Sequence, residues 1–264
     1  MARMIKTGSM FSRRMITLML IVFIFFKINA QKPLDSTLVS KDPTKFRYSS
    51  LILPGALITI GIIGLESHTL KDVSAGINEE RDEHIDDLIT IDDFTQYAPV
   101  ALTYGLDAFG VNAKHSFKDR TLVLATSYLV MSSTVLILKS TARVERPDGS
   151  SFNSFPSGHT ATAFMGAEML WQEYKHHSIW YGVLGYSLAI TTGTFRVYND
   201  RHWFNDVVMG AGIGILSTKI GYWLLPFMKN KVFKSKKENN IGYNGMVLPF
   251  FSTEGIGLSA VVRF

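Results

Sequence analysis

Six apolar stretches, separated by short polar segments, constrain this chain more than any other feature of its sequence. They cover residues 51–65, 97–111, 121–138, 161–171, 179–195 and 207–227. Each approaches the ~20 apolar residues that a helix needs to cross a bilayer, although the shorter ones need flanking residues to complete a span. The chain is 47% hydrophobic over 264 residues, which is too apolar for an ordinary soluble domain. We therefore expect an all-α, integral membrane bundle of about six helices.

The N-terminal segment 1–30 has the pattern of a secretory signal. Arg13 and Arg14 precede an apolar core, and a cleavage site follows before Gln31. An uncleaved anchor is the alternative, because Ile28 is larger than the residues that cleavage sites usually contain. The membrane-embedded domain is then expected over 31–230.

The C-terminal segment 231–264 begins as a basic linker and ends in an alternating pattern. Apolar side chains recur at every second position over 256–264, and Gly245 and Gly255 mark turns. This pattern predicts a short β-hairpin, with a loosely ordered tail as the alternative.

The basic charge of the chain is arranged for a membrane and not for nucleic acid. The net charge is +5, but the lysines and arginines flank apolar blocks and form no stripe interleaved with aromatic residues. The sequence has no cysteine, which excludes disulfides, thiolate chemistry and cysteine metal sites.

Positive charges mark four loops as cytoplasmic by the positive-inside rule. They precede 51–65 and 121–138, and they follow 161–171 and 207–227. The acidic stretch 79–87 and the loops around Arg146 and His202 then face outward. Six spans with a cytoplasmic start conflict with a cleaved signal, because cleavage would leave the mature N-terminus outside. Both predictions hold together only if the stretch 97–111 does not cross the membrane.

Three polar clusters interrupt the apolar pattern, and this topology brings all three to one side. In the first, "KSTARVERPDG", Lys139 ends a span and Arg146 follows seven residues later. Two cations of this kind suit a tetrahedral oxyanion, because lysine supplies a point charge and arginine a planar fork of donors. Taken alone, snorkelling of Lys139 and Arg143 toward lipid headgroups explains the cluster as well.

The second cluster is "SFPSGHTATAF", in which Ser157, Gly158 and His159 are expected to form the first turn of a helix. Unpaired N–H groups and the positive end of the helix dipole make such a turn an anion site. Glycine allows close approach to the backbone, and His159 can carry a proton near neutral pH. An ordinary capped helix is the alternative.

The third cluster, "FRVYNDRHWFND", adds a third cation, Arg196. His202 and Asp206 are spaced i, i+4, which puts them on one face if a helix begins near Asn199 or Asp200. An aspartate bonded to one imidazole nitrogen leaves the other as a base or nucleophile. A purely structural pair is the alternative, and a metal site is disfavoured because the three cations would repel the metal.

Together these residues resemble the three-part signature of the type 2 phosphatidic acid phosphatase superfamily, which includes bacterial acid phosphatases and vanadium haloperoxidases. The matching positions, all between residues 139 and 206, are Lys139, Arg146, Pro147, Pro156, Ser157, Gly158, His159, Arg196, His202 and Asp206. Each part is weak alone, but three in order at the right spacing are specific. The family usually has serine where Phe195 stands, so local packing or substrate choice is expected to differ.

The resemblance implies a role for each matching side chain. His202 would be the nucleophile, Asp206 would orient it, and His159 would protonate the leaving group and later activate water. The phosphate oxygens would be held by Lys139, Arg146, Ser157, Gly158 and Arg196. Three cations and a helix N-terminus supply the charge stabilisation, so neither a metal ion nor a cofactor is implied.

The expected substrate is a phosphorylated membrane lipid, reached from the periplasmic face of a bacterial inner membrane. The stretches "IDDFTQYAP" and "NDRHW" resemble the versions found in Bacteroides-like bacteria, some of which remove a phosphate from lipid A, so lipid A ranks first. Undecaprenyl diphosphate, phosphatidylglycerophosphate and phosphatidate are the alternatives. A vanadium-dependent haloperoxidase and a non-catalytic membrane protein are the competing classes, and the oligomeric state is not predicted.

Overall fold

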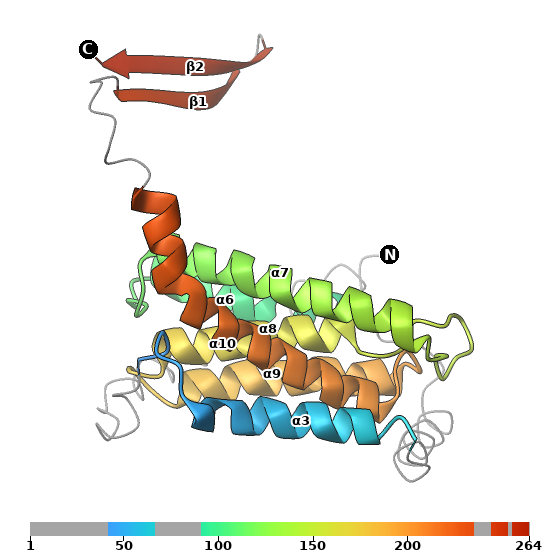
Figure 1. Ribbon diagram of the computed structural model, residues 1–264. Helices are drawn as coiled ribbons and strands as arrows, with labels where there is room; N and C mark the ends of the chain where they lie inside the picture. Colours follow the sequence, from blue (N-terminus) through green and yellow to red (C-terminus); the bar gives the residue numbers. More distant parts are fainter. Residues whose placement is uncertain (1–41, 67–90, 235–243, 253–254, 264) are drawn as a thin grey trace, which may run out of the picture. The chain divides into compact units, whose positions relative to one another are not determined.

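The computed structural model of the chain describes residues 42–66, 91–234, 244–252 and 255–263 (Figure 1). The predicted signal or anchor at 1–30 and the acidic stretch 79–87 lie outside these ranges. The chain divides into two compact units after Pro226, and each is described by itself.

All six predicted apolar stretches are helical, so the expectation of an all-α bundle is confirmed. The helices are α3 (Ile52–Ile63, preceded by the 3-10 turn η1, Tyr48–Leu51), α6 (Ala98–Ala108), α7 (Phe117–Ala142), α8 (Gly158–Tyr174), α9 (Trp180–Tyr198) and α10 (Phe204–Lys234). A one-turn helix that the apolar pattern does not predict, α5 (Asp92–Thr95), stands just before α6.

Helix α8 is the centre of the first unit, and nearly all of its residues are buried. It packs against α6, α7 and α9. Met165 of α8 also shares an apolar cluster with Val135 of α7 and Ile213 of α10. Small residues such as Ala163 and Ala167 allow the neighbouring helices to approach this closely.

Helix α10 packs against α8 through glycines spaced four residues apart. A Cβ added at Gly210 would lie 2.5 Å from the carbonyl oxygen of Ser157, and one added at Gly214 would collide with the carbonyl oxygen of Ala161. Real side chains do not tolerate such distances, so only glycine permits this contact. The N-terminal part of α8 is therefore held directly against α10.

The helices run back and forth between two ends of the bundle, which we name the Ser157 end and the Lys175 end after the residues that flank α8. Asp92, just before α6, bonds to Arg196 near the end of α9 at the Ser157 end. The Lys114 N–H, just before α7, donates to the carbonyl of Glu173 at the Lys175 end. Helices α6, α8 and α10 thus run from the Ser157 end to the Lys175 end, and α7 and α9 run back (Figure 1). This arrangement favours a stretch 97–111 that runs from one end of the bundle to the other, and disfavours a re-entrant segment.

Two helices in the described ranges, α7 and residues 204–230 of α10, are long and apolar enough to cross a bilayer by length and composition. Other helices also present large apolar side chains outward. Ile60, Ile62 and Ile63 of α3 are exposed, as is Ile190 of α9. Exposed aliphatic faces of this kind suit contact with lipid.

The second unit contains the predicted β-hairpin. Strand β1 (Asn244–Ser252) pairs antiparallel with β2 (Gly255–Arg263), in a register that sets Asn244 opposite Arg263 and Ser252 opposite Gly255.

Candidate active site

The three polar clusters of the sequence meet at the Ser157 end, where hydrogen bonds join their loops. The Asp148 N–H donates to the carbonyl of Asp200 over 3.2 Å, and the Ser157 N–H donates to the carbonyl of Asp206 over 3.0 Å. Arg201 and Asp148 add a salt bridge of 3.0 Å. Each loop is thus fixed relative to the other two.

His202 and Asp206 form the predicted pair. The His202 Nδ1 lies 3.5 Å from the Asp206 Oδ2. The same carboxylate oxygen accepts hydrogen bonds from the Ser154 hydroxyl and from the Trp203 N–H, the latter over 3.0 Å. Because Nδ1 faces the carboxylate, Nε2 is the imidazole nitrogen left for chemistry.

The expected helix start in this cluster is wrong. The chain leaves α9 after Tyr198, passes through Asp200 with a positive φ of 55°, and begins α10 at Phe204. His202 therefore lies in the connection, and Asp206 lies in the first turn of α10. The Asp206 carboxylate accepts the N–H of the residue before the helix, as a capping carboxylate does. The pair forms across this helix start and not along one helical face.

Burial governs the charge of His202. The side chain is 2% exposed, and this burial lowers its pKa to about 4, although Asp206 opposes the shift. At neutral pH the imidazole is therefore neutral, which is the form whose free ring nitrogen can act as a base or a nucleophile.

Lys139 and Arg146 both reach Asn153, in the loop between α7 and α8. Lys139 donates to the backbone carbonyl of Asn153, and Arg146 Nε donates to its side-chain oxygen over 2.9 Å. Burial, and then the charge of Arg196, lower the pKa of Arg146. The cations are thus close enough to repel one another, and an anion among them would relieve the repulsion.

Arg196 is a buried cation whose hydrogen-bond donors are only partly satisfied. Its NH1 donates to the Asp92 Oδ2 over 2.6 Å. Its Nε is buried and has no hydrogen-bond partner among the residues that the structure describes. Since an unsatisfied buried donor is costly, a phosphate oxygen at this position would stabilise the site.

Ser157 stands at the N-cap of α8, one position before the helix and not in its first turn as predicted. Its buried hydroxyl accepts from the Thr160 N–H over 3.4 Å and lies 2.9 Å from the Thr160 hydroxyl. Gly158 is the first helical residue. A Cβ there would make only an ordinary contact with Val135, so space alone does not require glycine at this position.

His159 is paired with a residue that the sequence signature does not contain. Its Nε2 lies 3.0 Å from the Asp93 Oδ1, and the same oxygen lies 3.7 Å from Arg196 NH1. Asp93 therefore connects His159 to the cation group. The Ser157 end thus holds a second His–Asp pair besides His202 and Asp206.

Asp92 and Asp93 come from α5 and were missed as site residues by sequence reasoning. The contact from Asp92 to Arg196 joins positions 104 residues apart, so no local spacing reveals it. The available signal was two adjacent carboxylates before an apolar stretch. Such a pair is ordinary at a helix start and does not by itself indicate a site.

A cavity of about 540 Å³ opens beside Lys139 and is also lined by Ser140, Arg143, Ser151, Phe152 and Asn153. Its size is within the range of small-molecule sites. The described residues contain no group of three His, Asp or Glu side chains that could hold a metal ion. The expectation that no metal is required stays a prediction.

Among known protein families, the PAP2 superfamily matches residues 120–229 of this chain. A lipid A 1-phosphatase of Porphyromonas gingivalis is 40% identical over 135 residues, which cover 51% of this chain and 30% of that protein. The chain thus spans under a third of that relative's length. A lipid A 1-phosphatase of Helicobacter pylori is 24% identical over 182 residues, which cover 67% of this chain and 89% of that protein.

Two crystal structures are similar to parts of this chain. Aquifex aeolicus LpxE is 23% identical with a TM-score of 0.43, over 57% of this chain and 92% of that one. A PAP2 type phosphatidylglycerolphosphate phosphatase of Bacillus subtilis is 21% identical with a TM-score of 0.38, over 83% of this chain and 98% of that one.

The segment matched to the family holds all three polar clusters, from Lys139 to Asp206, that converge at the Ser157 end. Residues 120–229, which contain these clusters, are thus similar to the PAP2 superfamily.

Proposed function

We propose that this protein is a membrane-embedded phosphatase that hydrolyses a lipid phosphate monoester through a phosphohistidine. The observation that carries the proposal is the convergence of three cations on the His202–Asp206 pair. The charges of Lys139 and Arg196 both act on His202. A neutral, carboxylate-paired imidazole among cations fits a nucleophile that attacks a phosphate dianion.

In the first step, His202 Nε2 attacks phosphorus, an N–P bond forms and the P–O bond to the lipid breaks. The lipid oxygen takes its proton from His159, which lies beside Asp93. As the phosphoryl group binds, the imidazole of His202 gains positive charge, which the Asp206 carboxylate stabilises.

In the second step, water attacks phosphorus and the N–P bond breaks, so that inorganic phosphate leaves and His202 is regenerated. His159, now neutral, accepts the proton of the attacking water. Lys139, Arg146 and Arg196 stabilise the equatorial oxygens in both steps, and the N-terminus of α8 adds its dipole.

The proposed substrate is lipid A, with dephosphorylation at position 1. This assignment draws on the activity for which the P. gingivalis relative is named and on the cavity beside Lys139, which leaves room for a headgroup next to the proposed phosphate site. Undecaprenyl diphosphate and phosphatidylglycerophosphate are alternatives that an assay separates.

We further propose a bacterial inner-membrane location with the Ser157 end facing the periplasm. The positively charged segments that precede α3 and α7 and follow α8 favour this orientation, because cytoplasmic loops are enriched in lysine and arginine. The apolar outer faces of α3, α7 and α9 support embedding in lipid.

The test uses the full-length protein in detergent, with phosphate release measured from lipid A, undecaprenyl diphosphate and phosphatidylglycerophosphate. His202→Ala should lower kcat at least ~1,000-fold, because no nucleophile remains, and should abolish the acid-labile phosphoenzyme trapped from labelled substrate. His177→Ala is the matched control, since His177 contacts the Asn112 carbonyl at the Lys175 end.

Full turnover by a folded His202→Ala variant would end the assignment of the nucleophile. If phosphate is released faster from phosphatidylglycerophosphate or undecaprenyl diphosphate than from lipid A, the proposed mechanism stands but the substrate assignment is wrong.

A further inference from the structure

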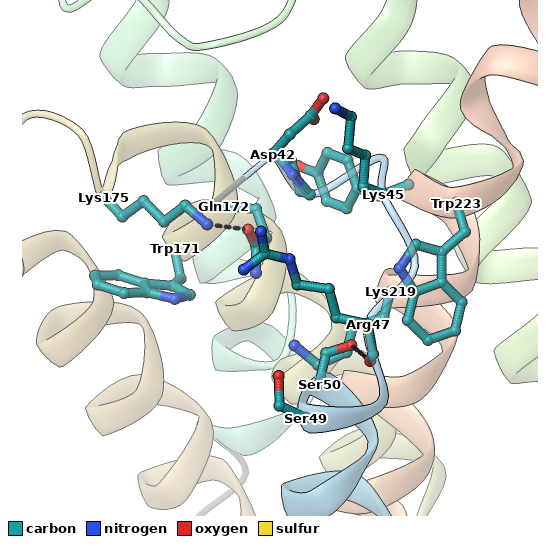
Figure 2. A pocket seen from close by; sticks show the side chains of 12 residues that line it. Asp42, Lys45, Arg47, Ser49, Ser50, Trp171, Gln172, Lys175, Lys219 and Trp223 are labelled. Atoms are coloured by element: carbon teal, nitrogen blue, oxygen red, sulfur yellow. Dashed lines mark hydrogen bonds between the residues drawn. The ribbon is translucent and has the colours of Figure 1, made fainter. Parts of the chain in front are cut away.

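A second basic site lies at the Lys175 end, away from the catalytic groups. This basic pocket has a volume of about 270 Å³, between the segment before α3, the end of α8 and the middle of α10 (Figure 2). Its walls include Lys45, Arg47, Trp171, Lys175, Lys219 and Trp223.

Positive charge exceeds negative charge on the walls of the pocket. Four of the lining residues are cationic, and Asp42 is the one carboxylate among them. The Asp42 carboxylate already accepts from the backbone N–H and the hydroxyl of Thr44, over 3.0 and 2.9 Å. Figure 2 shows the side chains of Arg47 and Lys175 pointing toward one another across the pocket. Like charges in this arrangement are stabilised by an anion between them.

The floor of the pocket is a fixed hydrogen-bond chain. The buried Lys175 donates to the Gln172 side-chain oxygen over 2.6 Å, and Gln172 donates to Glu168 over 2.7 Å. Lys219 closes the chain with a 2.6 Å salt bridge to the same Glu168 oxygen. The floor is thus arranged in advance, which lowers the entropic cost of binding a ligand.

The charge of Lys175 is destabilised by its surroundings. Burial, and then the nearby charge of Lys114, lower the pKa of Lys175 to about 8, while Glu168 opposes the shift. An anion beside Lys175 would restore the stability of its protonated form.

The length of α8 covers most of the ~30 Å thickness of a bilayer core. Its 17 residues span about 25 Å, from His159 in the first turn to Lys175 just past the last. With the catalytic groups at one surface, the basic pocket lies at the other. Trp171 and Trp223 flank it, and tryptophan is enriched where lipid headgroups begin.

We propose that the basic pocket binds the phosphate of an anionic phospholipid headgroup in the leaflet opposite the catalytic site. Arg47 and Lys175 hold the phosphate oxygens, and the two tryptophans contact the glycerol and the upper acyl chain. Basic pockets between membrane helices recognise headgroups by this chemistry. The proposal rests on the membrane placement and does not depend on which lipid is dephosphorylated.

The test is thermal unfolding of the full-length protein in neutral detergent, titrated with short-chain phosphatidylglycerol. Phosphatidylcholine of the same chain length and inorganic phosphate serve as separate arms. The variant is Lys45→Gln with Arg47→Gln, since both side chains are exposed and their loss leaves the core intact. Lys118→Gln removes an exposed cation at the same end of the bundle but outside the pocket.

Phosphatidylglycerol should raise the Tm of the wild type and of Lys118→Gln, and phosphatidylcholine should not. The double variant should need ~10- to 30-fold more phosphatidylglycerol for the same rise, because two cations near a headgroup are lost. An equal response of all three proteins, or an equal effect of phosphatidylcholine, would overturn the proposal. Stabilisation by inorganic phosphate that only the double variant loses would also overturn it, in favour of a free-phosphate site.

Discussion

Asp93 contacts both the proposed acid, His159, and the buried cation Arg196. Burial, and then the charge of Arg196, lower the pKa of His159, and the Asp93 carboxylate acts in the opposite direction. A general acid must be protonated when the substrate binds, so a neighbouring carboxylate extends its working range to higher pH. Asp93 is in this view a positioning residue that acts through His159.

We expect Asp93→Asn to move the basic limb of the kcat/KM profile to lower pH. Without the carboxylate the pKa of His159 falls further, so the protonated acid is lost at lower pH. A fall of one pKa unit corresponds to about a tenfold lower kcat/KM on that limb. The measurement is kcat/KM between pH 4 and 9, and the acidic limb should stay in place. A uniform loss at every pH would instead indicate a merely structural role for Asp93.

Some residues of this site can be predicted from the sequence and others cannot, and the separation of the partners along the chain decides which. His202, Asp206 and Arg196 lie within one short segment, so their chemistry can be read from spacing. Asp93 lies far from His159 in sequence and meets it only after the helices pack. Carboxylates that lie far from their partners in sequence carry no spacing signal.

At the level of helices, the close contact of α8 with α10 positions the proposed phosphate site relative to the proposed nucleophile. Ser157 precedes α8 and Asp206 lies in the first turn of α10, and the backbone hydrogen bond between them is 3.0 Å long. Gly210 lies one turn further along α10 and faces the carbonyl oxygen of the same residue, Ser157. A shift between the two helices would therefore change the position of His159 relative to His202.

We expect Gly210→Ala to lower both stability and kcat. Its new methyl group would collide with the backbone of α8, and overpacking of this kind costs about 1–3 kcal/mol. Gly105→Ala is the matched control, because a Cβ at Gly105 meets nothing within 4 Å. Thermal unfolding and phosphate release are measured on both variants. Equal behaviour of the two would show that the contact is not required.

Helix prediction succeeds where the apolar pattern is long and fails at the ends. The stretch 207–227 identifies α10, but the start at Phe204 depends on the Asp206 carboxylate, which caps the chain at Trp203. The one-turn α5 is too short to show any period. Element ends are set by single hydrogen bonds, to which a pattern of hydrophobicity is insensitive.

At the scale of the whole molecule, the two ends of the bundle are expected to face opposite sides of the membrane. The sequence has no cysteine, so single cysteines can report each side without background. Ser150 lies in the exposed loop at the Ser157 end, and Lys118 is exposed at the Lys175 end.

We expect Ser150→Cys to react with a membrane-impermeant maleimide in cells whose outer membrane is permeabilised. Lys118→Cys should react only after the inner membrane is broken. Labelling is read from the mass of the purified protein. The reverse pattern would place the catalytic groups in the cytoplasm, and labelling of both from one side would contradict passage of the helices across the bilayer.

The contact between Asp92 and Arg196 also determines how much of the chain a fragment must contain to keep the site intact. The family match begins at residue 120, but the carboxylate that balances the buried Arg196 lies before it, in α5. A fragment cut at residue 120 would keep every signature residue and still bury an arginine without this partner, at a cost of several kcal/mol. A fragment grafted into another membrane protein would therefore have to include α5 as well as residues 120–229.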